Sequence, residues 1–129
     1  MRRILIVALC APLTACATTY LEVPFPTYEY SGIDLLAGVS GRVELSDKCL
    51  LIYREGAEPG TPPANLVMPL GTRLQGSRIT LPEENGGASF RLGETIRVQG
   101  GFHELDGTHS RSRNPGGCAG TSFTVNRLY

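Results

Sequence analysis

The sequence predicts an all-β fold, a small barrel of five main strands, and three observations support this prediction. Apolar and polar residues alternate with a period of two in several short stretches, which is the pattern of half-buried strands. The 129 residues include 16 glycines and 9 prolines but no tryptophan, which favours many turns between short strands. Beyond the first 15 residues, no stretch of ten or more residues has helical periodicity. The length allows one small domain.

The N-terminus has the composition of an export signal. Arg2 and Arg3 precede an apolar run over residues 4–13, which is far shorter than the roughly 20 residues that span a bilayer as a helix. Residues 13–16, with the sequence LTAC, resemble the bacterial lipobox, in which a small residue precedes the lipidated cysteine. The resemblance implies that residues 1–15 are a lipoprotein signal peptide, that diacylglycerol is attached to Cys16, and that the new amino terminus is acylated. An ordinary cleaved signal peptide is the alternative.

The lipobox resemblance also implies a location, the periplasmic face of the outer membrane. In Gram-negative bacteria an aspartate after the lipidated cysteine tends to retain a lipoprotein in the inner membrane, and this sequence has Ala17 there. Acyl chains would anchor the protein, since each buried CH₂ contributes roughly 0.8 kcal/mol. The whole chain has a formal net charge of zero, and loss of Arg2 and Arg3 with the signal leaves 10 basic and 12 acidic side chains. This balance argues against nucleic acid as a partner.

The cysteines predict one disulfide. Of the four, Cys10 leaves with the signal and Cys16 carries lipid, so Cys49 and Cys118 remain as a pair in an oxidising compartment. Closing a loop of about 70 residues would stabilise the fold by roughly 4 kcal/mol in the chain-entropy account. Metal ligation or redox chemistry is the alternative use, and the lack of a Cys-x-x-Cys motif argues against it.

Residues 16–35 are expected to form a lipidated tether that precedes the barrel domain at 36–129. The composition of this segment is unusual for a tether, because aromatic side chains seek burial. Its aromatic residues are Tyr20, Phe25, Tyr28 and Tyr30. The segment therefore either covers an edge of its own domain or docks on a partner protein or at the membrane interface.

Short alternating stretches define the predicted strands. The clearest is 95–103, in which Ile96, Val98, Gly100 and Phe102 share one face. The first two strands, separated by three turn residues, form a hairpin. The predicted strands cover residues 38–45, 49–54, 66–68, 78–81, 89–92, 95–103 and 121–126, with turns at 46–48 and 83–87 and loops at 56–64 and 104–120.

Glycines inside the first and fourth of the main strands indicate sharp coiling of the sheet, which suits a small OB-like barrel. The chain also resembles a loose group of small exported bacterial domains with such a barrel and paired cysteines. The resembling pieces are LAGVSGRV at 36–43, CL at 49–50, MPLG at 68–71, LGETIRVQGG at 92–101 and GC at 117–118. Because most members of this group have no assigned activity, the resemblance implies a fold and a compartment rather than a function.

Residues 103–109, with the sequence HELDGTH, are the best candidate for metal chemistry. His103 and His109 flank two carboxylates, and all four residue types bind Zn²⁺ or Cu²⁺. The second histidine falls six residues after the first, however, which departs from the His-Glu-x-x-His pattern. A solvated loop is the simpler interpretation, so no metal or other cofactor is predicted. A metal-handling envelope protein that uses this loop is the alternative function.

The sequence offers no catalytic residues, and the protein is expected not to be an enzyme. Neither remaining cysteine is expected to be a free nucleophile, and no Gly-x-Ser-x-Gly elbow occurs in the chain. Glu83 and Glu84 are adjacent, so in an extended chain their carboxylates would point to opposite faces. The glycine pairs lack the lysine and the strand-to-helix setting of a phosphate-binding loop.

The predicted function is a non-enzymatic binding or assembly module on a lipid anchor, with an envelope protein or cell-wall component as its partner. OB-like barrels commonly bind oligosaccharides on the face of their central strands and on the adjacent loops. By analogy with that fold, the candidate ligand-binding residues are Tyr53, Arg97, Gln99, His103 and Arg111.

Overall fold

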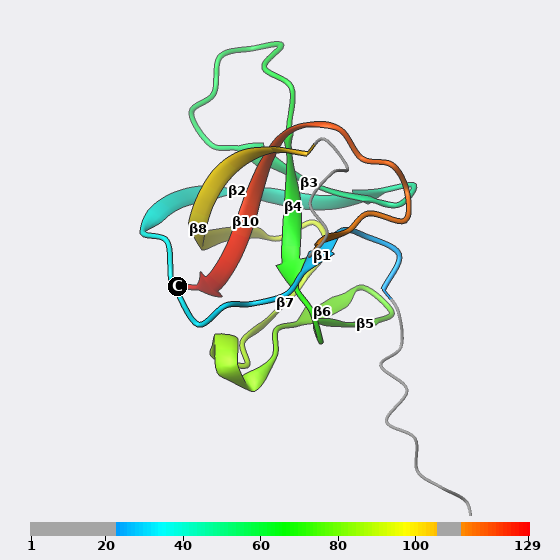
Figure 1. Cartoon of the computed structure of the whole chain (residues 1–129). Helices are drawn as coiled ribbons and strands as arrows, with labels where there is room; N and C mark the ends of the chain where they lie inside the picture. The colour runs from blue at the N-terminus through cyan, green and yellow to red at the C-terminus, as the bar shows by residue number, and fades with distance from the viewer. Residues whose placement is uncertain (1–22, 106–111) are drawn as a thin grey trace, which may run out of the picture.

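A computed structural model describes residues 23–105 and 112–129 of the chain (Figure 1). The predicted signal peptide, Cys16, and the candidate residues His109 and Arg111 lie outside these ranges. In the described residues the fold is all-β, and the helical structure is a single 3₁₀ turn, η1 (Glu83–Asn85). None of the described segments forms a helix with the length and hydropathy needed to cross a bilayer.

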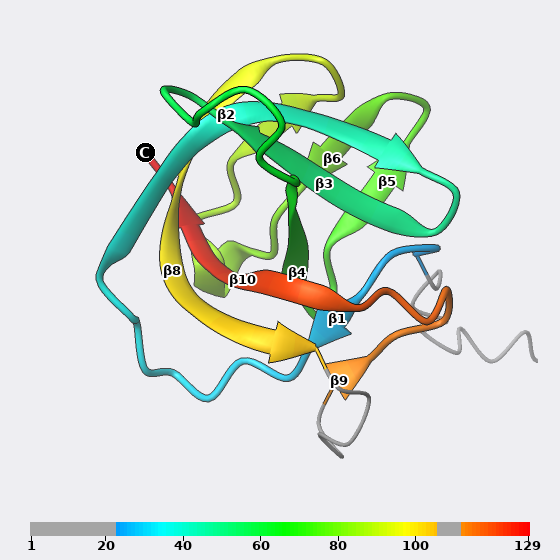
Figure 2. The same cartoon turned by 90° about the horizontal axis from the view of Figure 1, so that it is seen from above.

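Five strands close into the predicted barrel (Figures 1 and 2). They are β2 (Ala37–Ser46), β3 (Cys49–Arg54), β4 (Ala64–Pro69), β8 (Thr95–Leu105) and β10 (Gly120–Leu128), in the order β10-β8-β2-β3-β4. Antiparallel ladders join these neighbours, and a parallel ladder between β4 and β10 closes the ring. The all-β, OB-like five-stranded barrel is therefore confirmed.

Two glycines allow the strands to coil this tightly. A Cβ atom at Gly41 in β2 would lie 2.3 Å from the carbonyl oxygen of Tyr53, and one at Gly100 in β8 would lie 1.7 Å from that of Thr124. Both distances are far below van der Waals contact, so only glycine allows the neighbouring backbones to approach this closely. Both glycines therefore lie where two barrel strands approach each other closely.

The barrel interior is filled by the apolar face of each strand. The fully buried side chains include those of Val43, Leu50, Ile52, Leu66, Val98, Phe123 and Val125. Phe102 shares the predicted face with Val98 but remains 49% exposed, because it lies toward the end of β8. There its ring packs edge-on against Phe123, with centroids 4.9 Å apart, and the Arg54 guanidinium lies over it.

A second, three-stranded sheet lies at one end of the barrel (Figure 1). It consists of β5 (Arg73–Gln75), β6 (Arg78–Thr80) and β7 (Ser89–Arg91), and it buries Ile79 and Phe90 in the same core as the barrel. Alternation in the sequence predicts β6 and β7, whereas β5 was not predicted. The predicted turn at 83–87 contains η1 and ends with Gly86 and Gly87 at positive φ.

Residues 23–35, here called the strap, pack on the barrel. In the strap, β1 (Thr27–Tyr28) lies parallel to β4 and antiparallel to β9 (Ser112–Arg113). Phe25 is only 1% exposed and belongs to the main core. Of the two alternatives for this aromatic segment, the structure therefore supports packing on its own domain.

The predicted Cys49–Cys118 disulfide is present, with Cα atoms 5.8 Å apart and a sequence separation of 69. It joins the start of β3 to the segment before β10. Val67 and Tyr28 pack against the two cysteines, so the bridge also covers the outer side of β4.

We predict that Gly100→Ala destabilises the protein by about 2 kcal/mol or more, because the new methyl group must displace the backbone of β10. The measurement is the free energy of unfolding by urea denaturation. Gly38→Ala is the matched control, since a Cβ there meets nothing closer than 3.8 Å. An equal effect of the two substitutions would contradict the close-approach explanation.

Candidate binding groove

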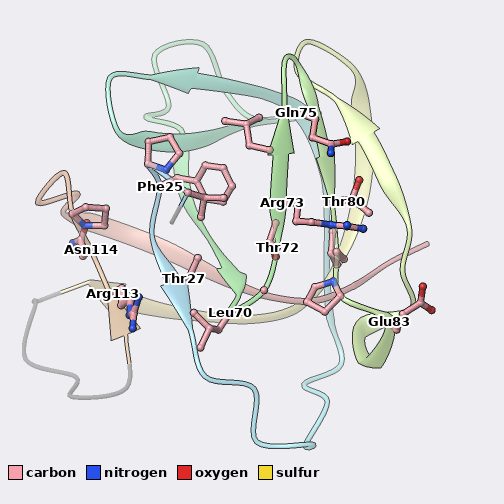
Figure 3. Close-up of a pocket in the computed structure, with 17 residues that line it drawn as sticks. Phe25, Thr27, Leu70, Thr72, Arg73, Gln75, Thr80, Glu83, Arg113 and Asn114 are labelled. Atoms are coloured by element: carbon pink, nitrogen blue, oxygen red, sulfur yellow. The ribbon is translucent and has the colours of Figure 1, made fainter. Parts of the chain in front are cut away.

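A groove of about 870 Å³ opens beside the strap (Figure 3). The strap and the segment that follows β9 form one wall, and the β4–β5 connection, β5, β6 and the residues after β6 form the other. Its lining residues are Val23, Pro24, Phe25, Thr27, Leu70, Gly71, Thr72, Arg73, Leu74, Gln75, Thr80, Leu81, Pro82, Glu83, Arg113, Asn114 and Pro115. The volume lies in the range typical of small-molecule sites, roughly 300–1,000 Å³.

The strap wall is held mainly by Tyr28. Its hydroxyl donates to the carbonyl oxygen of Val125 at 2.7 Å and accepts from Nδ2 of Asn126 at 2.8 Å. Burial raises the pKa of Tyr28 to about 12, so the phenol stays protonated and continues to donate. On the main chain, the carbonyl oxygen of Tyr28 accepts from the amide of Leu70 at 2.7 Å, which joins the two walls at the base of the groove.

A β-bulge places Asn126 where it can make these contacts. The β8–β10 register shifts between Val125 and Arg127, and both Val125 and Asn126 are buried although they are adjacent. Besides its bond to Tyr28, the Asn126 side chain accepts from the amide of Leu35 at 2.7 Å through Oδ1. Its main-chain carbonyl accepts from Nδ2 of Asn85 in η1 at 3.1 Å. One residue therefore holds the strap and the η1 turn in place.

Arg127, the next residue, adds an ion pair to the strap. Its Nε donates to Oδ2 of Asp34 at 2.8 Å, and its Nη2 donates to the carbonyl oxygen of Glu84 at 3.3 Å. The Tyr30 hydroxyl donates to the other carboxylate oxygen of Asp34. The hydrogen bond from Arg127, followed by that from Tyr30, lowers the pKa of Asp34.

The opposite wall turns sharply between β4 and β5. Gly71 has a φ of 95°, which favours glycine, and the Thr72 hydroxyl donates to the carbonyl oxygen of Pro69 at 2.6 Å. This turn leads into β5, and Thr80 on the neighbouring strand β6 also lines the groove (Figure 3).

The chemistry of the groove is that of an amphipathic binding site. Its lining is mainly aliphatic and aromatic, whereas Arg73, Arg113 and Glu83 are exposed and give the lining a formal charge of +1. No histidine, cysteine or aspartate is among the described residues that line it. The lining therefore combines an apolar surface with a few charged groups, which is the composition typical of a small-molecule site.

The residues proposed from the sequence as ligand contacts lie elsewhere and have other partners. Tyr53 on β3 lies under the Arg42 guanidinium, and Arg97 on β8 lies over Tyr129. Gln99 donates to the main-chain carbonyl of Leu35 at 3.2 Å. His103 is hydrogen-bonded to Thr124, with Nδ1 and Oγ1 2.9 Å apart. None of these four residues lines the groove.

The outer face of β4, where an OB-like barrel could present a ligand surface, is covered by the chain itself. All six residues of β4 are buried. Outward-facing Val67 is fully buried against Cys118, Tyr28 and Cys49. The strap and the disulfide therefore occupy this part of the barrel surface.

The metal hypothesis rests on a loop that is only partly described. His103 is the one proposed ligand whose side chain lies in the described part, and there it contacts Thr124. In residues 23–103 and 113–129 no group of three or more His, Cys, Asp or Glu side chains is placed to hold a metal ion.

The groove was not predicted from the sequence, because its lining comes from four separate parts of the chain. Two local signals point toward it: an aromatic residue in the proline-containing strap, and the bend indicated by Pro69 and Gly71. Neither signal shows that these segments face each other. No protein-family model, no curated protein and no solved structure matches the chain.

We predict that Asp34→Asn lowers the urea midpoint of unfolding at neutral pH, because it removes the charged partner of Arg127. The pKa of Asp34 is depressed in the folded state, so its contribution is complete above about pH 4 and is lost as the pH falls further, through the folded-state pKa. The difference between the wild-type chain and Asp34→Asn should therefore shrink on acidification. Glu29→Gln, at an exposed carboxylate of the same strap, is the control. A difference that does not depend on pH would show that the ion pair is not its cause.

Proposed function

We propose that this protein is an outer-membrane lipoprotein, anchored through Cys16, whose periplasmic barrel is a non-enzymatic binding module. The observation that carries the proposal is the groove. It is preformed, mainly apolar, and lined by a few polar and charged side chains, which are the features of a ligand site. An envelope component is the class of ligand that such a location would offer.

The Cys49–Cys118 disulfide supports the proposed compartment, because structural disulfides persist mainly in oxidising environments such as the periplasm. An anchor at Cys16 would also fix where the groove lies. Val23 lines the groove and lies seven residues after Cys16, so the groove would open close to the attached lipid.

We predict that intact mass spectrometry of protein extracted from membranes without reductant finds an acylated chain beginning at Cys16. Its mass should also be lower by two hydrogens because of the disulfide. Cys16→Ser is the control and should abolish both acylation and membrane retention. A chain that begins elsewhere, or that carries no acyl group, would contradict the proposed anchor.

We also predict that a photoreactive amino acid in place of Thr80 forms a light-dependent adduct in intact cells, because Thr80 lines the groove. The control is the same amino acid in place of Arg91, which is exposed on β7 but does not line the groove. Mass spectrometry of the adduct identifies what occupies the groove. Adducts at neither position, or the same adducts at both, would contradict a binding function for the groove.

A further inference from the structure

We propose that the groove binds a long-chain carboxylate, with the aliphatic chain between its apolar walls and the carboxylate paired with Arg73. This inference rests on the proposed function as a binding module and names the class of its ligand. Four features of the groove support it: its apolar lining, its lack of long free strand edges, its charge, and its distance from the predicted anchor.

The lining favours a chain of methylene groups. Three of the larger apolar side chains that line the groove are buried or half-buried: Phe25, Leu74 and Leu81. The other apolar lining residues are Val23, Pro24, Leu70, Pro82 and Pro115. Burial of aliphatic surface against such side chains is favourable and needs no hydrogen bonds.

The walls are poorly suited to an extended peptide. Each N–H and C=O group of a peptide needs a partner when it leaves water, and a bound peptide usually obtains these partners from a free strand edge. β1 has β4 and β9 on its two sides, and β6 has β5 and β7. In the described chain, the strands beside the groove that keep a free side are β5 and β9, which are only three and two residues long. The Thr72 hydroxyl already donates to Pro69.

The charge of the groove favours a monoanion. Arg73 from β5 and Arg113 from β9 both line the groove (Figure 3). Glu83 is the acidic residue of the lining and leaves a formal charge of +1. Arginine pairs well with a carboxylate because its planar group offers several donors. A carboxylate headgroup therefore has an arginine partner in the lining, Arg73.

The predicted anchor would place the groove within reach of membrane lipid. Between Cys16 and Val23 there are seven residue steps, which span at most about 25 Å when fully extended. The groove would then lie near the bilayer surface whatever the conformation of the intervening residues. Long-chain carboxylates partition into that surface.

The test measures palmitate binding by calorimetry, below its micellar concentration. The protein is the full chain with Cys16→Ser, so that no covalently attached acyl chain competes. We expect saturable binding of one palmitate per chain. Thr80→Trp, which fills the groove, should weaken binding by about tenfold or more, and Arg73→Gln should weaken it less. Thr95→Trp and Arg91→Gln, at exposed positions outside the groove, are the matched controls and should bind as the parent chain does.

Two further binding measurements test the proposal if Thr80→Trp does not fold. Leu70→Glu, at a position 39% exposed, places a negative charge in the lining and should also weaken palmitate binding. A quaternary ammonium salt with the same alkyl chain should bind about tenfold more weakly than palmitate, because it presents a cation to Arg73.

The inference is overturned if palmitate does not bind saturably, if the groove variants bind as well as their controls, or if the ammonium salt binds equally well. These outcomes are separate from failure of the proposed function. If the adduct at position 80 is a protein, the binding module is retained and the proposed ligand class is wrong. If the chain binds palmitate but is not acylated in cells, the ligand class is retained and the proposed anchor is wrong.

Discussion

The parallel pairing of β4 with β10 closes the barrel, and the rest of the structure depends on it. Residues 122–124 of β10 pair with residues 65–67 of β4, two strands that are remote in sequence. Nδ2 of Asn65 strengthens the junction by donating to the carbonyl oxygen of Ala119 at 2.9 Å. Because the ring is small, neighbouring backbones must approach closely, and Gly41 and Gly100 provide the space.

Closure also decides which surface remains for a ligand. Once β4 lies between β3 and β10, the strap pairs with its last two residues, and Cys118 is brought against its outer face. The chain thereby covers part of the barrel wall on which an OB-like barrel could bind. The groove lies at one end of the barrel, between the strap and the second sheet.

The three residues after the parallel ladder hold the strap and η1 in position. The main-chain carbonyl of Val125 and the side-chain amide of Asn126 bind the hydroxyl of Tyr28, and the Arg127 side chain binds Asp34. On the other side, Asn126 and Arg127 bind the 3₁₀ turn. The bulge at this point turns Asn126 toward the interior, where its side-chain amide bonds two groups of the strap and its main-chain carbonyl bonds Asn85 of η1. Stability of the barrel and shape of the groove are therefore coupled through β10.

The sequence by itself determined the fold class, the disulfide and most strands, because these follow from local physical rules. Alternation of apolar and polar residues marks the half-buried strands, and glycine marks positions that have no room for a side chain. The two cysteines that have no other expected role form a disulfide. Tertiary structure alone decided where the candidate groove lies. The groove joins residues such as Phe25, Leu74 and Arg113, whose proximity depends on barrel closure and on the bulge at Asn126. Neither barrel closure nor the bulge produces a periodic pattern in the sequence. Tyr53 and Arg97, which are candidate ligand contacts from the sequence, lie outside the groove, where Arg42 stacks on Tyr53 and Arg97 on Tyr129.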